Sequence, residues 1–138
     1  MKQTVFADTA AWLALINKSD TLHKKAKKVR DGLLDHNSQF VVTDYIIVEI
    51  ANSLSRIPLR ESAINLINAM TVSKNIEIVE IDKEVYKEAW KLYSSRTDKE
   101  WSLTDCTSFI IMNHKRIADA FTSDRHFEQA GFNILLKE

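Results

Sequence analysis

The sequence has few of the residues that interrupt or cross-link a chain. Its 138 residues include one cysteine, one proline and two glycines. Cys106 has no partner for an internal disulfide, which is typical of a reducing compartment, and we expect a cytoplasmic protein. The scarcity of proline and glycine excludes a chain dominated by linkers or loops. Length and composition predict one globular domain, which we expect to span residues 1–138.

The sequence also lacks long apolar runs, and its formal net charge is zero. No apolar stretch approaches the roughly 18 residues of a membrane span, and the N-terminal segment reaches Asp8 too early for a secretory signal. We therefore expect no membrane association. Basic and acidic residues both number 19, so no global field attracts a polyanion. A local basic surface or a bound cation could still do so, and the composition leaves nucleic-acid binding open.

Apolar segments of strand length alternate with amphipathic helical segments along the chain. This alternation predicts a parallel, doubly wound sheet with helices on both faces. The expected strands are residues 3–7, 39–43, 75–81, 120–122 and 132–136. The helix expected over residues 21–35 has a lysine-rich face, which is typical of a solvated surface, with phosphate contact as the alternative.

One helix, expected within residues 101–113, has a carboxylate in its first turn. Ser102 is a good N-cap, and Asp105 stands three residues later in the position of a capping-box acid. Asp105 shares a helix face with Phe109 and Met112, which favour a core. Its carboxylate is therefore either a cap that leans outward or a charge held in a pocket.

Three further acids occupy comparable positions. Asp8 and Asp124 follow predicted strands, and Glu49 lies about one turn into a helix that Thr43 or Asp44 caps. Asp8 could simply complement a helix dipole, and Glu49 could extend to solvent. However, strand ends and the following helix starts meet at one rim of a parallel sheet. Carboxylates gathered there repel each other unless a bound cation offsets their charge. A set of ligands made only of oxygen atoms favours Mg²⁺ or Mn²⁺.

Other side chains give weaker signals. His126 follows Asp124 by two residues and could approach the rim, although an isolated histidine is more typical of a surface. We expect Trp12, Trp90 and Trp101 to be core or dimer contacts rather than base-stacking platforms. No glycine-rich phosphate loop supports binding of a nucleoside triphosphate.

The acids lie in motifs that resemble those of the PIN-domain nucleases, especially the VapC-like toxins of toxin–antitoxin pairs. The resemblance covers nearly the whole chain, and its most specific parts are Ser-Leu-Thr-Asp-Cys at 102–106 and Phe-Thr-Ser-Asp-Arg-His-Phe at 121–127. It implies a single PIN-like α/β domain over residues 1–138 whose five-stranded parallel sheet has the order 3-2-1-4-5. It also implies metal-dependent RNA cleavage, with Mg²⁺ or Mn²⁺ held by Asp8, Glu49, Asp105 and Asp124.

The same resemblance implies supporting residues and partners. Ser102 and Thr122 match polar positions that support the acids. The implied partners are an RNA substrate, a second copy of the chain in a homodimer, and a cognate antitoxin that masks the acidic rim, often with a basic residue.

Three alternatives stay open. One is a non-catalytic RNA-binding or scaffold protein with this fold, against which the complete set of four acids speaks. Another is an RNA-processing nuclease without an antitoxin. The third is a hydrolase with an aspartyl nucleophile, but that chemistry usually has a second aspartate two residues after the first, where Ala10 stands.

Overall fold

A computed structural model describes residues 2–137 and contains one five-stranded sheet. All its strand pairs are parallel, in the order β3-β2-β1-β4-β5. This confirms the expected fold class and strand order. The strands are β1 (Thr4–Ala7), β2 (Gln39–Thr43), β3 (Ile76–Val79), β4 (Asp119–Phe121) and β5 (Asn133–Ile134).

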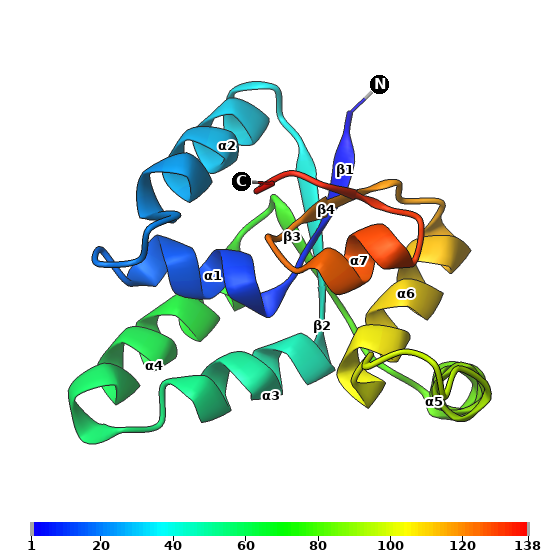
Figure 1. Cartoon of the computed structure of the whole chain (residues 1–138). Coiled ribbons are helices and arrows are strands. Elements are labelled where there is room, and N and C mark those ends of the chain that lie inside the picture. Colours follow the sequence, from blue (N-terminus) through cyan, green and yellow to red (C-terminus); the bar gives the residue numbers. More distant parts are fainter. Residues whose placement is uncertain (1, 138) are drawn as a thin grey trace.

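Helices cover both faces of the sheet. In Figure 1, α1, α2 and α4 lie on one side of the strands and α5 and α6 lie on the other. The helices are α1 (Thr9–Ile16), α2 (His23–Asp35), α3 (Asp44–Ser53), α4 (Ile57–Val72), α5 (Lys83–Ser95), α6 (Leu103–Lys115) and α7 (Arg125–Gln129). Among the described residues, no helix is long and apolar enough to cross a membrane.

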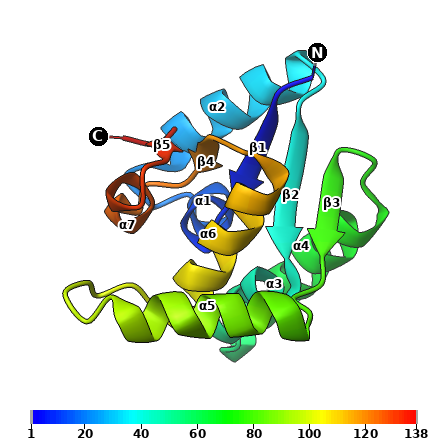
Figure 2. The same ribbon diagram turned by 90° about the vertical axis from the view of Figure 1, so that its right-hand side faces the viewer.

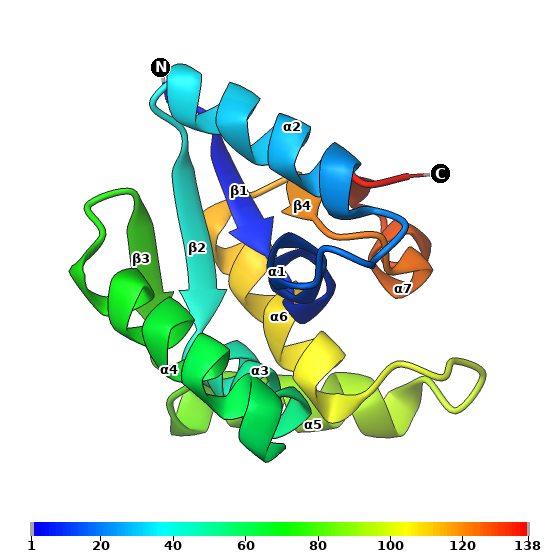
Figure 3. The same ribbon diagram turned by 90° about the vertical axis from the view of Figure 1, so that its left-hand side faces the viewer.

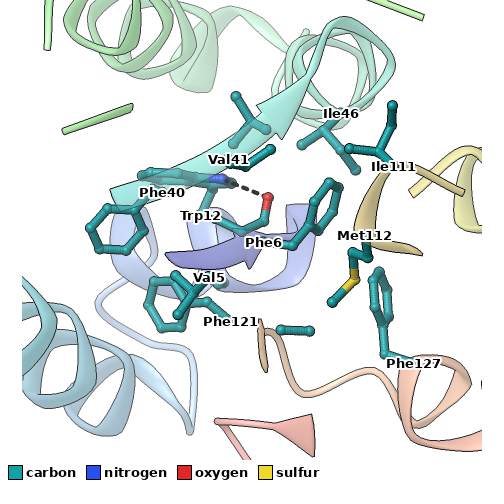
Figure 4. Close-up of a cluster of buried hydrophobic side chains, with 14 of the residues drawn as sticks. Val5, Phe6, Trp12, Phe40, Val41, Ile46, Ile111, Met112, Phe121 and Phe127 are labelled. Atoms are coloured by element: carbon teal, nitrogen blue, oxygen red, sulfur yellow. Dashed lines mark hydrogen bonds between the residues drawn. The ribbon is translucent and has the colours of Figure 1, made fainter. Parts of the chain in front are cut away.

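The central strand β1 forms the middle of the core. Val5, Phe6 and Ala7 are fully buried, as expected for a parallel strand that has helices on both faces. Phe6 packs at 6.1 Å from Phe127, and the Trp12 indole N–H donates to the Ala7 carbonyl at 3.3 Å (Figure 4). The first residue after β1 is thereby held at a fixed place in a rigid core.

The strand ends differ from their predicted limits at the two edges of the sheet. The strand predicted over residues 75–81 ends at Val79, because the Ile81 amide donates to the Asp44 carboxylate at 3.0 Å rather than to β2. The strand predicted over 132–136 is assigned only at Asn133–Ile134, although the Leu136 amide still donates to the Thr122 carbonyl at 3.1 Å. An edge strand pairs on one side only, so its ends are less strictly determined than those of β1.

The carboxyl ends of the strands and the first turn of α6 lie at the same end of the molecule. Figure 2 shows β1, β2 and β3 pointing toward this rim, with α6 starting there and running back along the sheet. From the opposite side, Figure 3 shows α1 starting directly where β1 ends. Side chains from β1, α6 and the segment after β4 therefore face one another across a short distance.

Candidate metal centre

Asp8 follows β1 and is the most buried acid at the rim. Ala7 pairs with Phe121, so Asp8 and Thr122 leave neighbouring strands side by side. The Thr122 hydroxyl donates to Asp8 Oδ2 at 2.8 Å, and only 5% of Asp8 is exposed. Burial, together with the charges of Asp105 and Glu49, raises the pKa of Asp8 to about 7 despite this hydrogen bond. The Asp8 carboxylate is therefore costly to ionise without a cation.

Asp105 is fixed by the predicted capping box. Its amide donates to Ser102 Oγ at 2.9 Å, and its carboxylate Oδ2 accepts from the Ser102 amide at 3.1 Å. Phe109 and Met112 on the same face are buried, as expected, and Asp105 itself is 9% exposed. Asp105 is thus part of a helix cap and also an acid that faces the other acids. Its sequence position allowed either role, and the structure shows that it has both.

Asp124 follows β4 and caps α7. Its Oδ1 accepts from the His126 amide at 2.8 Å, and its own amide donates to the Thr122 hydroxyl at 3.1 Å. The buried Thr122 hydroxyl thus links the Asp8 carboxylate to the Asp124 backbone. This bridge fixes the relative positions of the ends of β1 and β4.

His126 joins this group instead of lying on an isolated surface. Its Nδ1 lies 2.9 Å from Asp105 Oδ2 and 3.6 Å from Asp124 Oδ1. Ligand atoms of these three residues all lie within 4.8 Å of one another. Partial burial lowers the pKa of His126, but the hydrogen bond to Asp105 and the charges of Asp124, Asp105 and Glu100 outweigh this effect and raise it.

Glu49 approaches the same rim from α3. Its Oε1 accepts a hydrogen bond from the Thr9 hydroxyl, and its charge contributes to the raised pKa of Asp8. Asp8 occupies the N-cap position of α1, and Thr9 is the first helical residue. A hollow of about 310 Å³ beside Glu49 and Thr104 gives access to this side of the rim.

All four predicted acids and both supporting residues are therefore found at one rim. The roles of Thr9 and His126 in holding the acids were not predicted from the sequence. Signals were present, since Thr9 directly follows Asp8 and His126 stands two residues after Asp124. Neither signal specified which carboxylate the side chain would contact.

Comparisons with known proteins are consistent with this geometry. A sequence profile of the PIN domain matches residues 5–133. The chain belongs to the PIN domain family. A relative from Mycobacterium tuberculosis, the 23S rRNA-specific endonuclease VapC20, is 29% identical over 129 residues, which cover 93% of this chain and 95% of that protein.

Three solved structures share the fold. The crystal structure of M. tuberculosis VapC20, described as a sarcin-ricin loop cleaving toxin, has a TM-score of 0.83 and 26% identity, covering 93% of this chain and 95% of that one. VapBC2 from Rickettsia felis, bound to a DNA fragment from its promoter, has a TM-score of 0.68 over 96% of both chains. FitAcB from Neisseria gonorrhoeae has the same score over 94% and 95%. Both are 13% identical and show the shared fold alone.

The acidic cluster of this PIN domain has the chemistry of a site for a hard divalent cation. Carboxylate oxygens are the ligands that such ions prefer, and the charges of Asp105 and Glu49 act on Asp8. The raised pKa of Asp8 supports the fit, because a bound cation would favour the charged carboxylate and so oppose that shift. Asp105 and Asp124 are also held rigidly by caps, as metal ligands commonly are.

Proposed function

We propose that this PIN domain is a metal-dependent endoribonuclease and the toxin of a toxin–antitoxin pair. The observation that carries the proposal is that Asp105 lies beside Asp124 and His126, while its charge and that of Glu49 act on the buried Asp8. Asp8 resists ionisation there. A purely structural role gives no reason to gather four acids in a partly buried place. The similarity to VapC20 over nearly the whole chain supports the same activity.

The proposed roles follow from the hydrogen bonds. Asp8, Glu49, Asp105 and Asp124 hold Mg²⁺ or Mn²⁺, with Thr122 orienting Asp8 and Ser102 orienting Asp105. When bound, such an ion supplies positive charge for a phosphodiester and lowers the pKa of an attacking water. This explains how a chain with a formal net charge of zero acts on a polyanion.

A structured ribosomal RNA is the first substrate to test. VapC20 is named as an enzyme specific for 23S rRNA, and the two chains match over 93% of this one. We therefore expect RNA cleavage in the cytoplasm, where ribosomes are accessible. The local acidic rim makes cation-free binding of the RNA backbone unfavourable, so binding and cleavage should both require the metal.

The partners follow from charge and exposed apolar surface. We expect an antitoxin protein to place a basic side chain at the acidic rim, because a cation there relieves the same repulsion that a metal relieves. We also expect a homodimer, for which exposed apolar side chains such as Val48, 56% exposed, and Ile64, 52% exposed, supply contact surface.

The direct experiment is a cleavage assay on purified ribosomal RNA with Mg²⁺ or Mn²⁺ and with excess chelator. We expect discrete fragments only with the metal, and none from Asp105→Asn, which retains the size and capping ability of the side chain. Equal cleavage in chelator would contradict the metal mechanism. Metal-dependent binding without cleavage would favour the non-catalytic RNA-binding alternative.

A further inference from the structure

An open hollow of about 800 Å³ lies between the end of α5 and the first turn of α6. Its volume is within the roughly 300–1,000 Å³ of sites that bind small ligands. Ser102 lines the hollow and also holds Asp105 through the capping box. Glu100, another lining residue, acts electrostatically on His126. The hollow is therefore lined by residues that act on the acidic cluster, although none of the acids of the cluster lines it.

Two exposed aromatic rings form one wall of the hollow. Trp90 is 50% exposed and Tyr93 is 43% exposed, and their rings stack with centroids 5.6 Å apart and 23° between their planes. Trp12 and Trp101 are each 6% exposed, as expected for the core, so Trp90 differs from the other two tryptophans. Nearly parallel, solvent-facing rings are suited to stacking against a nucleobase, whatever its identity.

Two cations lie beside this wall, in the loop between α5 and α6. The Arg96 guanidinium lies 5.1 Å from the centroid of the Trp101 ring, and Lys99 Nζ lies 6.0 Å from it. Arg96 is oriented by two 3.0 Å hydrogen bonds to Asp98, whose charge it offsets. Aromatic faces next to positive charge are the two features that proteins combine to bind single-stranded nucleic acid.

We propose that this hollow binds an unpaired nucleotide of the RNA substrate, with its base against Trp90 and Tyr93 and its phosphate beside Lys99. The inference rests on the proposed ribonuclease function and adds a recognition site next to the cleavage site. Such a site requires an RNA with a looped or single-stranded segment, because bases in a duplex are already stacked and paired. Proteins generally recognise RNA sequence through such splayed bases.

The main rival occupant is a second copy of the chain. Tyr86 is 42% exposed and lies four residues before Trp90, so it shares their face of α5. Tyr86 lines a different hollow, with Tyr45 and Ile81, toward the β3 end of α5 (Figure 2). A second copy that covered this aromatic face would contact Tyr86 as well, whereas a nucleotide in the 800 Å³ hollow would not.

The experiment compares Trp90→Ala and Tyr93→Ala with Trp90→Phe and the matched control Tyr86→Ala. The probe is a fluorescein-labelled single-stranded RNA, supplied intact and as a series with one abasic position each. Binding is measured by fluorescence anisotropy with Ca²⁺ in place of Mg²⁺, and gel electrophoresis verifies that the RNA stays intact. Sedimentation velocity gives the oligomeric state of each variant, and circular dichroism verifies its fold.

We expect Trp90→Ala to weaken binding roughly five- to hundredfold, the usual effect of losing one stacked base. Trp90→Phe should restore most of the binding, and Tyr86→Ala should bind like the unaltered protein. At one abasic position, Trp90→Ala should cause no further loss, because the stacked base is already missing.

Three other results would each overturn the inference in a recognisable way. If the unaltered protein cleaves RNA and Trp90→Ala binds it equally well, the base site is wrong while the proposed function stands. If Trp90→Ala and Tyr86→Ala both dissociate a dimer, this face of α5 is an interface between copies. If the unaltered protein neither binds nor cleaves any RNA, the proposed function and the base site are both wrong.

Discussion

The two halves of the carboxyl rim use the same residue types in different ways. At the ends of β2 and β3, the polar side chains of Thr43, Asp44 and Asp82 bond to backbone amides. Thr43 accepts from Ile46 at 3.2 Å, and Asp44 accepts from Ile81 at 3.0 Å. Asp82 likewise caps α5. These side chains stabilise helix starts and loops, and their carboxylates do not face one another.

At the ends of β1 and β4, side chains bond to one another. The Thr122 hydroxyl donates to the Asp8 carboxylate, and His126 Nδ1 lies between Asp105 and Asp124. Asp105 and Asp124 also cap helices, which fixes their positions, but Asp8 is left buried with raised pKa. An aspartate after a strand therefore indicates a site when its carboxylate faces other acids rather than a neighbouring backbone.

The largest difference between the two halves of the rim should be in the RNA cleavage rates of their variants. Asp105→Asn should lose more RNA cleavage than the roughly 10–100-fold that outer-shell partners of a metal typically cost, because it removes a ligand. Asp44→Asn keeps an oxygen for the Ile81 amide and should retain cleavage. Initial rates at saturating Mg²⁺ provide the measurement. Equal rates for the two variants would remove the distinction between the halves.

Stability should show the next largest contrast, through Asp8→Asn. Because the folded-state pKa of Asp8 is raised from 3.8 to about 7, the protonated form is stabilising below 3.8, and this contribution is lost as the pH rises through 7. In metal-free buffer, Asp8→Asn should therefore gain up to about 4 kcal/mol over the unaltered protein above pH 7, and almost nothing below 3.8.

Urea denaturation across this pH range tests the expectation. Asp82→Asn is the control from the other half, because Asn remains a good cap for the Val85 amide and should change stability by less than about 0.5 kcal/mol. If the gain from Asp8→Asn were the same at both ends of the range, the pKa of Asp8 would not be raised in the folded protein.

A smaller difference in stability and metal binding is expected between substitutions of two fully buried threonines. Thr122→Val leaves the Asp124 amide without its acceptor and removes the donor to Asp8, which should cost about 1–3 kcal/mol. Thr43→Val removes one cap and should cost about 1 kcal/mol. Only Thr122→Val should also weaken Mn²⁺ binding, which calorimetry measures. Weakened binding in both variants would indicate a general loss of structure.

The smallest contrast concerns two helix caps. Ser102→Ala and Asp82→Ala should each cost about 1 kcal/mol of unfolding free energy, measured by thermal denaturation. Ser102→Ala should in addition reduce the cleavage rate, because the capping box orients Asp105. An unchanged cleavage rate in Ser102→Ala would show that the capping box is not required to orient Asp105.

The residues of the rim were predictable because they follow local rules. Strand ends and helix caps determine where Asp8, Asp105 and Asp124 stand, and alternation of strands and helices brings them to one end of the sheet. The same rules identified Asp44 as a structural acid, and its bond to the Ile81 amide agrees with that interpretation.

Contacts between side chains from distant segments could not be predicted in the same way. His126 reaches Asp105 across 21 positions, and Thr9 reaches Glu49 across 40, so each depends on how α3, α6 and α7 pack. For the same reason, the sequence left open whether Trp90 would be a core residue or an exposed dimer contact. The helical period places it on a face of α5, but only packing decides whether another element covers that face.

The central claim is that Asp8 and Asp105 belong to one metal site. The most direct test is a calorimetric titration of the purified protein with Mn²⁺, beside the Asp8→Asn and Asp105→Asn variants. We predict that the unaltered protein binds Mn²⁺ and that each variant loses this binding while keeping its fold. Binding that survives in either variant, or no binding by the unaltered protein even with a non-cleavable RNA present, would contradict the claim.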